Sequence, residues 1–173
     1  MSSSATPRTS APPGIYAIDP SASTVAFVGK SLGGLVKAPG TFALTAGRIE
    51  VTGPERASIE VTLDATSFDT ANPKRDTHVR SADFLDASRF PTIDYRATAV
   101  MSGESGWVVD GELTVKGVSA SVPLNVASVE VLGATLRVRA NTTVSRRALG
   151  ITKSRGMIGA TLPVTLDITA TMS

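Results

Sequence analysis

The sequence predicts an all-β protein, either a closed up-and-down barrel or a sandwich of about eight to ten strands. Apolar and polar residues alternate with a period of two almost everywhere after residue 15, which is typical of strands with one buried face. Short glycine-containing turns favour antiparallel pairing, because parallel strands need long crossover connections. Long strands between Trp107 and Ala140 favour the barrel, which leaves no free edges.

The composition is that of one globular domain. Of the 173 residues, 42% are hydrophobic and 18% are charged, and a chain of this length can bury a substantial core. The absence of cysteine excludes disulfides and thiolate metal sites, and the single histidine excludes multi-histidine zinc sites. A net charge of +2 is too small for a dedicated nucleic-acid binder. We expect a flexible tail over residues 1–14 and one domain over residues 15–173.

The first residues predict the compartment. Residues 1–14 are small and polar and lack the apolar run of a signal peptide. No stretch approaches the ~20 apolar residues of a membrane-spanning helix. We therefore expect a cytoplasmic protein, or a periplasmic or secreted one if Met1 replaces a removed signal.

Four strands are expected in the first half of the domain. Residues 24–28 are short and rich in β-forming side chains. Pro39-Gly40 interrupts residues 35–44 and indicates a bulge or a bent edge strand, followed by a separate short strand over residues 47–51. In residues 58–63 the apolar side chains share one face, which indicates a half-buried strand.

The second half of the domain alternates more regularly. Lys116-Gly117 marks a hairpin turn, and a change of phase near Ala127 or Ser128 indicates a β-bulge. A basic loop, residues 146–159, precedes the last strand. The expected strands are residues 92–99, 107–115, 122–132, 134–141 and 162–170.

A polar insert, residues 65–95, interrupts the alternation, and we expect a short helix within about residues 72–88. Asn72 can cap this helix, because Pro73 then occupies its first position. Asp76 and Arg80 are four residues apart, the spacing of a helical ion pair.

Several short motifs follow one another in a fixed order and resemble those of the YceI-like family, the lipocalin-like polyisoprenoid-binding proteins of bacteria. The resemblance covers almost the whole chain after the tail, and the ordered set is far more specific than any one piece. The motifs are Tyr16-Ala17-Ile18-Asp19-Pro20 with Ser23 and Phe27, Gly40-Thr41-Phe42, Gly47-Arg48-Ile49, the series Ser67, Asp69-Thr70, Arg75-Asp76, His78, Arg80-Ser81, Asp83-Phe84, Phe90-Pro91 and Tyr95, and Gly111 to Val118.

The resemblance implies an extended eight-stranded antiparallel lipocalin-like β-barrel with a hydrophobic lumen and a helix near its mouth. It implies binding of long isoprenoid chains such as polyprenyl phosphates or isoprenoid quinones, with no cofactor besides that lipid. The sequence departs from the family pattern at Ser31, where many members have histidine, and at Leu149, which replaces an aromatic residue. It also lacks the usual secretion signal.

An isoprenoid lumen must be apolar and continuous, because the chain gains its binding energy by leaving water, at ~25 cal/mol per Å² of apolar surface. The alternation alone leaves a second interpretation, in which the inward side chains fill a packed core. The inward candidates are Phe27, Phe42, Leu63, Tyr95, Trp107, Leu113, Leu124, Leu136, Val138, Leu166 and Ile168.

Basic residues of the insert and the basic loop are candidates for the mouth, where arginine and histidine donors suit a phosphate or quinone head. The alternative for the insert is a self-satisfied network that fastens the helix to the barrel. The loop, with four bases and no acid between Arg146 and Arg155, can attract an anionic membrane surface or be a solvated loop. The mouth candidates are Arg75, Asp76, His78, Arg80 and Arg146.

Catalysis is not expected. Asp76 and His78 are two residues apart on a helix and point to different faces, so they cannot orient each other, and no phosphate loop or nucleophile elbow occurs. We expect a non-catalytic barrel, a monomer or homodimer, that binds or transports an isoprenoid lipid. The alternatives are an interaction or stress-response module with a self-filled barrel, and a scavenger of other hydrophobic molecules.

Overall fold

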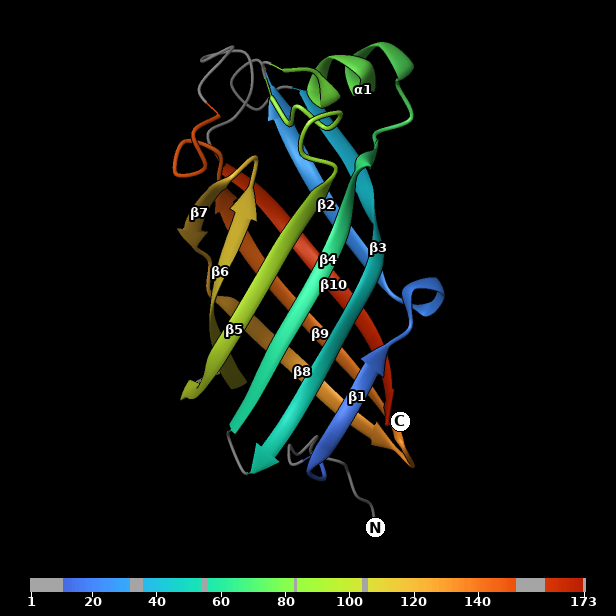
Figure 1. The fold of residues 1–173 in the computed structure, drawn as a ribbon, viewed down its shortest axis with the longest axis vertical. Helices are drawn as coiled ribbons and strands as arrows, with labels where there is room; N and C mark the ends of the chain where they lie inside the picture. The colour runs from blue at the N-terminus through green and yellow to red at the C-terminus, as the bar shows by residue number, and fades with distance from the viewer. Residues whose placement is uncertain are drawn as a thin grey trace.

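The computed structural model describes residues 11–31, 36–53, 56–82, 84–103, 106–151 and 161–172. This part of the chain is almost entirely β-structure, with one α-helix, α1, and a 3₁₀ turn, η1 (Figure 1). The elements are β1 Gly14–Ile18, η1 Pro20–Ala22, β2 Thr24–Ser31, β3 Val36–Gly53, β4 Arg56–Asp69, α1 Pro73–Arg80, β5 Thr92–Gly103, β6 Gly106–Val115, β7 Val118–Ser121, β8 Leu124–Leu132, β9 Thr135–Ser145 and β10 Thr161–Met172.

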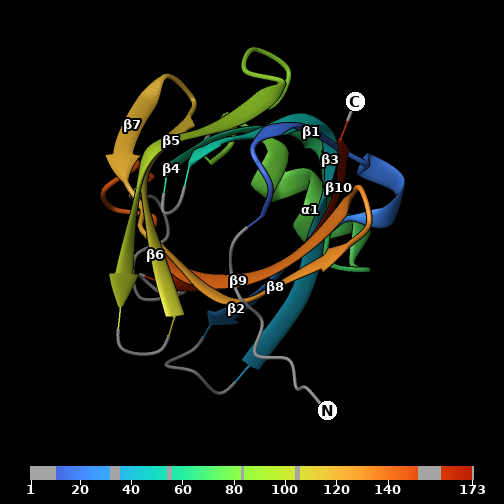
Figure 2. The same ribbon diagram turned by 90° about the horizontal axis from the view of Figure 1, so that it is seen from below.

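The strands form one antiparallel sheet that closes on itself. Going round the ring, the order is β10, β2, β3, β4, β5, β6, β8 and β9, and β9 pairs with β10 again. Figure 2, seen from below, shows these strands surrounding the centre of the molecule, with α1 visible at the far end. The expected eight-stranded antiparallel barrel is thereby confirmed.

At two places in the ring, two successive strands occupy one position, one above the other along the barrel. β1 and β2 both pair with β3 and β10, at successive heights. The 3₁₀ turn separates them, because Asp19 caps Pro20–Ala22 by accepting a hydrogen bond from the backbone N–H of Ser21. β7 and β8 likewise both pair with β6, and Pro123, which cannot donate to a sheet, lies between them.

The prediction of two separate strands on either side of residue 45 was wrong. β3 is continuous, and Pro39-Gly40 lies inside it, paired with Val28 and Phe27. Gly40 is needed for a close approach, since a Cβ atom at this position would collide with the ring of Phe27. The irregularities of register come later, between Thr41 and Ala43 and at two further points.

The turn chemistry predicted for the second half is present. β8 and β9 shift register between Val126 and Ser128, which confirms the bulge. Lys116 and Gly117 both have positive φ, 57° and 77°, as a two-residue hairpin turn of the right twist requires.

The insert covers one end of the barrel, the upper end in Figure 1. Asn72 caps α1 by accepting from the backbone N–H of Arg75, with Pro73 at the first position, as predicted. Turns after α1 bury Phe84 and Leu85 against the barrel, where they join a cluster that contains Phe27 and Phe68. No helix in the described ranges is long and apolar enough to cross a membrane.

Candidate functional site

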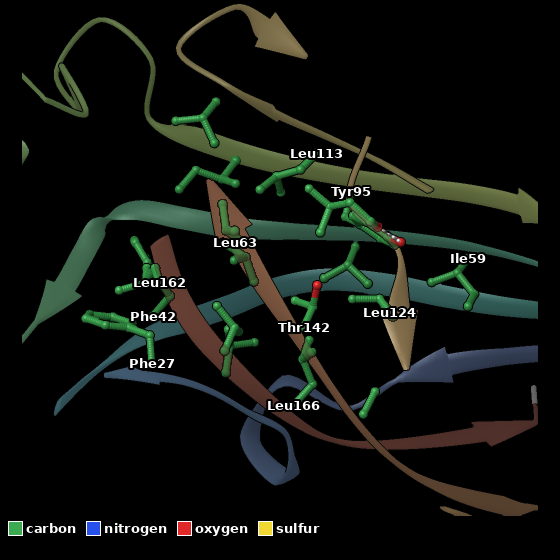
Figure 3. A pocket seen from close by; sticks show the side chains of 18 of the residues that line it. Phe27, Phe42, Ile59, Leu63, Tyr95, Leu113, Leu124, Thr142, Leu162 and Leu166 are labelled. Atoms are coloured by element: carbon green, nitrogen blue, oxygen red, sulfur yellow. Dashed lines mark hydrogen bonds between the residues drawn. The ribbon is translucent and has the colours of Figure 1, made fainter. Parts of the chain in front are cut away.

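An apolar cavity of about 210 Å³ occupies the barrel (Figure 3). Its wall comes from β1 to β6 and β8 to β10, from the turn after α1, and from the turn at residues 146–151. Residues far apart in sequence meet here because the inward face of every strand points to one axis. The lining residues are Ile18, Val25, Phe27, Phe42, Ile49, Ile59, Val61, Leu63, Leu85, Ile93, Tyr95, Val109, Leu113, Val115, Val122, Leu124, Val126, Val138, Ala140, Thr142, Val144, Arg146, Leu149, Ile151, Leu162, Val164, Leu166 and Ile168.

Three lining side chains carry polar groups, and each of these groups is bonded to a backbone carbonyl. The hydroxyl of Tyr95 donates to Val122 at 2.7 Å, and that of Thr142 donates to Pro123 at 2.7 Å. The guanidinium of Arg146 donates from Nη1 to the carbonyl of Ile151 at 3.0 Å. The surface offered to a ligand is therefore hydrocarbon.

Burial raises the pKa of Tyr95 well above its ordinary value, and the charge of Asp110 adds to this effect. The ring lies directly on Gly111, where a Cβ atom would collide with it. Tyr95 thus stays neutral and acts as a flat apolar wall whose hydroxyl is already used.

Most of the predicted lumen residues line the cavity. Trp107 and Leu136 do not, although both pack in the same core cluster: Leu136 is 2% exposed and Trp107 is half-buried. Their strands place them beyond the end of the cavity. The predicted residues in the lining are Phe27, Phe42, Leu63, Tyr95, Leu113, Leu124, Val138, Leu166 and Ile168.

Sequence reasoning missed two kinds of lining residue. Most of them lie on the inward face of a strand, as Ile59, Val61 and Leu162 do, so taking every residue of the apolar face as a candidate finds them. Leu85 and Leu149 belong to irregular segments, where no period indicates which side chain points inward.

The insert forms a network that fastens α1 to the end of β4. Asp76, 4% exposed, accepts from the hydroxyl of Thr70 at 2.5 Å and from its backbone N–H at 3.0 Å. Arg75 donates from Nε to the Thr70 hydroxyl at 2.8 Å, and Arg80 donates to the carbonyl of Phe68 at 2.6 Å. These donors and acceptors serve the fold, as the alternative interpretation of the insert proposed.

The expected ion pair between Asp76 and Arg80 is not formed as a direct contact. The Arg80 guanidinium turns towards the end of β4, and the carboxylate turns towards Thr70. Burial raises the pKa of Asp76, but the hydrogen bonds from Thr70 and the positive charge of Arg80 outweigh it, so the net pKa lies below its ordinary value. Asp76 is therefore ionised at neutral pH.

The five mouth candidates are not gathered at one point. Arg146 lines the cavity, whereas Arg75, Asp76, His78 and Arg80 are outside its lining. His78 is exposed and lies edge-on against Phe84, with ring centroids 5.0 Å apart.

The departures from the family pattern fall in different places. Leu149 is 3% exposed and lines the cavity beside Ile151, so a branched aliphatic chain stands where an aromatic ring would fill more of the lumen. Ser31 ends β2, paired with Val36, and its side chain is outside the described part of the chain, as are residues 152–160 of the basic loop.

Curated relatives resemble part of this chain. A UPF0312 protein of Ectopseudomonas mendocina is 40% identical over 74 residues, which are 42% of this chain and 39% of that protein. Protein YceI of an Escherichia coli strain is 37% identical over 71 residues, 41% of this chain and 37% of that protein. The matched stretch thus spans about two fifths of the length of these relatives.

Solved structures share the fold over most of the chain. BcnA of Burkholderia cenocepacia superposes with a TM-score of 0.77 at 23% identity, covering 89% of this chain and 99% of BcnA. A polyisoprenoid binding domain from Saccharophagus degradans, implicated in plant cell wall breakdown, superposes with a TM-score of 0.69 at 17% identity, covering 91% and 98%. The model of the YceI-like domain matches residues 16–170. The chain belongs to the YceI-like family.

Proposed function

We propose that this protein binds an isoprenoid lipid, of the polyprenyl phosphate or isoprenoid quinone type, in the barrel lumen and transports it without chemical change. One observation carries the proposal: the cavity is lined by hydrocarbon, and the polar groups of Tyr95, Thr142 and Arg146 are bonded to backbone carbonyls. A prenyl chain is the part of such a lipid that gains from this surface, at ~25 cal/mol per Å² buried. The polyisoprenoid binding domain with the same fold supports the ligand class.

A non-catalytic role is supported by where the reactive groups lie. His78 is exposed beside Phe84, and the carboxylate of Asp76 is held by Thr70, both outside the cavity lining. A general base must lie within hydrogen-bond reach of the group on which it acts, and neither residue lines the cavity that would hold the ligand.

Arg146 is the charged side chain of the cavity wall, and we propose that the ligand's polar head lies near it. The turn that carries Arg146 connects β9 with β10 at the end of the barrel covered by α1 (Figure 1). The positive charge of a guanidinium attracts an anionic phosphate head even when its N–H groups are bonded to the protein. The chain would then enter tail first.

A second candidate function is scavenging of other hydrophobic molecules. A lumen without a free polar group recognises hydrocarbon but not a particular hydrocarbon, so selectivity must come from shape or from the mouth. The self-filled barrel, in contrast, is opposed by the 210 Å³ cavity.

Native mass spectrometry of the protein purified from its own source, followed by organic extraction, tests the proposal. We expect a co-purifying species whose mass fits a series of isoprene units. Recovery of fatty acids or other hydrocarbons would favour the scavenger. A clean mass of the protein alone, with no uptake of added prenyl alcohol, would exclude both.

A pair of variants on β9 controls this experiment. Ala140 lines the lumen and is 5% exposed, whereas its neighbour Asn141 points outward. Ala140→Phe should fill the cavity and abolish uptake, and Asn141→Phe should leave uptake unchanged. Equal uptake by both variants would place the ligand outside the lumen.

A further inference from the structure

On several strands the cavity lining ends partway along the inward face. On β9 and β10, the paired residues Val138 and Ile168 line the cavity. The next inward pair on the same strands, Leu136 and Ala170, does not line it and is 2% and 0% exposed. The lumen is therefore filled by side chains immediately below the cavity.

The cavity lining ends in the same way on two other strands. On β1, Ile18 lines the cavity and Tyr16, two residues earlier, does not; on β6, Val109 lines it and Trp107 does not. Tyr16 is 1% exposed, and its hydroxyl donates to the carbonyl of Pro12 at 2.6 Å, which holds the chain before β1 against this layer. We call Tyr16, Trp107, Leu136 and Ala170, the next inward residues beyond the lining on their strands, the floor. Because the strands of a barrel are tilted, the floor is slanted, and Tyr16 and Trp107 pair with Ile49 and Val126, which line the cavity.

The depth of the cavity above the floor follows from strand geometry. Its lining extends from Val138 to Val144 on β9 and from Ile168 to Leu162 on β10, with the same separation on both strands. At ~3.3 Å per residue and a barrel tilt of roughly 40°, this separation corresponds to about 15 Å along the barrel axis. With carbon–carbon bonds of about 1.5 Å, an extended isoprene unit advances roughly 5 Å, so the depth suits about three units.

The volume gives a somewhat shorter length. A cavity of about 150 Å³ binds one benzene ring, which has about six atoms other than hydrogen, so the cavity of about 210 Å³ has room for roughly eight such atoms. Since an isoprene unit contributes about five such atoms, the volume corresponds to about two units.

We propose that the floor makes the lumen a ruler, which accepts about two or three isoprene units and leaves any remaining units of a longer chain outside the mouth. This inference rests on the proposed function and adds the length of chain that is bound. The floor residues Leu136 and Trp107 set the limit, because they lie directly beyond the lining residues Val138 and Val109.

Affinity for a series of prenyl alcohols of two, three, four, six and eight units tests the ruler. Each unit that enters the lumen should lower Kd about tenfold or more, because its apolar surface leaves water. Beyond three units Kd should stay constant. A Kd that keeps falling up to eight units overturns the ruler and leaves the proposed function intact, whereas no binding at any length overturns the proposed function itself.

Trp107 gives an independent readout, because it is the only tryptophan of the chain and belongs to the floor. Chains of three or more units should change its emission spectrum on binding, and chains of two units should bind with little change. An emission change that does not depend on chain length would contradict a floor at this level.

Two substitutions move the limit in opposite directions. Leu136→Ala should lower the floor, so that the chain length beyond which Kd no longer falls becomes longer by about one unit. Val138→Phe should raise the floor, so that this limiting chain length becomes shorter by about one unit. Asn141→Ala, on the outward face of β9, serves as the control, and circular dichroism verifies that each variant is folded. If the limiting chain length is unchanged in both folded variants, the ruler is wrong.

Discussion

Asp76 shows that a charged residue of the insert can serve the fold rather than the ligand. Its carboxylate accepts two hydrogen bonds from Thr70, and the Thr70 hydroxyl is in turn the acceptor for Arg75. A buried carboxylate is tolerated only when its desolvation is compensated in this way. The sequence showed that Asp76 had a local partner, but it indicated the wrong one, because spacing along a helix cannot reveal a partner in the strand before it.

Asp76→Asn is expected to lower the free energy of unfolding at pH 7 by about 1–3 kcal/mol, since a carboxylate acceptor for buried donors is lost. The pKa of Asp76 is lowered in the folded state, so its stabilisation is present above the unfolded pKa of about 3.9 and is lost as the pH falls through the lower folded pKa. Urea unfolding of both proteins should therefore show a difference at pH 7 that narrows in acid.

Glu130→Gln is the matched control, because Glu130 is an exposed carboxylate on β8. It should change the unfolding free energy by less than about 0.5 kcal/mol at either pH. A difference for Asp76→Asn that stays constant from pH 7 into acid would show that the ionised carboxylate is not the source of the stabilisation.

Tyr95→Phe separates stability from binding at a lining residue. Loss of the hydroxyl leaves the buried carbonyl of Val122 without this donor, and we expect the free energy of unfolding to fall by about 1–3 kcal/mol. The Kd for a prenyl alcohol should stay the same, because the hydroxyl faces the backbone rather than the lumen. Abolished binding with unchanged stability would instead assign the hydroxyl to ligand recognition.

At the level of the element, the sequence predicted which face of a strand is buried but not the height of a residue in the barrel. Alternation placed Val138 and Leu136 on one face of β9, and only Val138 lines the cavity. Height depends on how the strands are staggered against one another, which alternation does not record. Alternation also gave no sign of what Pro39-Gly40 does: these residues predicted a bulge or a bent edge strand, whereas the register with β2 is regular here and Gly40 makes room for Phe27.

The turn at residues 146–151 narrows or widens the lumen according to the side chain at position 149. Leu149→Phe restores the aromatic character of the family pattern and should reduce the cavity, so that the Kd of a four-unit prenyl alcohol rises at least about tenfold, as expected when apolar burial is lost. Displacement of a fluorescent hydrophobic dye measures this change. Ala148→Phe, at the exposed neighbouring position, should have no effect, and an equal loss in both variants would point to a disturbed turn instead.

At the level of the whole molecule, the long strands between Trp107 and Ala140 favoured a closed barrel, which leaves no free edges, but alternation alone left a sandwich open. The two shared positions of the ring were not predictable, because they depend on which neighbours β1 and β7 find in space. These short strands help to shape the cavity. η1 follows β1 and Pro123 follows β7, and Val122, the residue before Pro123, lines the cavity.

The charges at the end of the barrel covered by α1 are unevenly exposed. Lys74, Arg89 and Arg147 are exposed there. Of the acids, Asp69 is exposed as well, whereas Asp76 and Asp86 are buried. The described surface at this end therefore offers more positive than negative charge to a partner, despite the small net charge of the chain. Anionic lipid surfaces attract such groups by about 1 kcal/mol for each base close to the membrane, and salt weakens the attraction.

We therefore expect weak, salt-sensitive binding to vesicles that contain anionic lipid, with the ligand mouth facing the membrane. In co-sedimentation at low salt, the double variant Lys74→Glu with Arg147→Glu should bind such vesicles at least about tenfold more weakly, and binding to neutral vesicles should be weak for both proteins. The matched control reverses charge on the barrel wall, Arg48→Glu with Arg96→Glu, on the outward face of β3 and β5. Equal losses in the two double variants would show a response to net charge alone, with no preference for this end of the barrel.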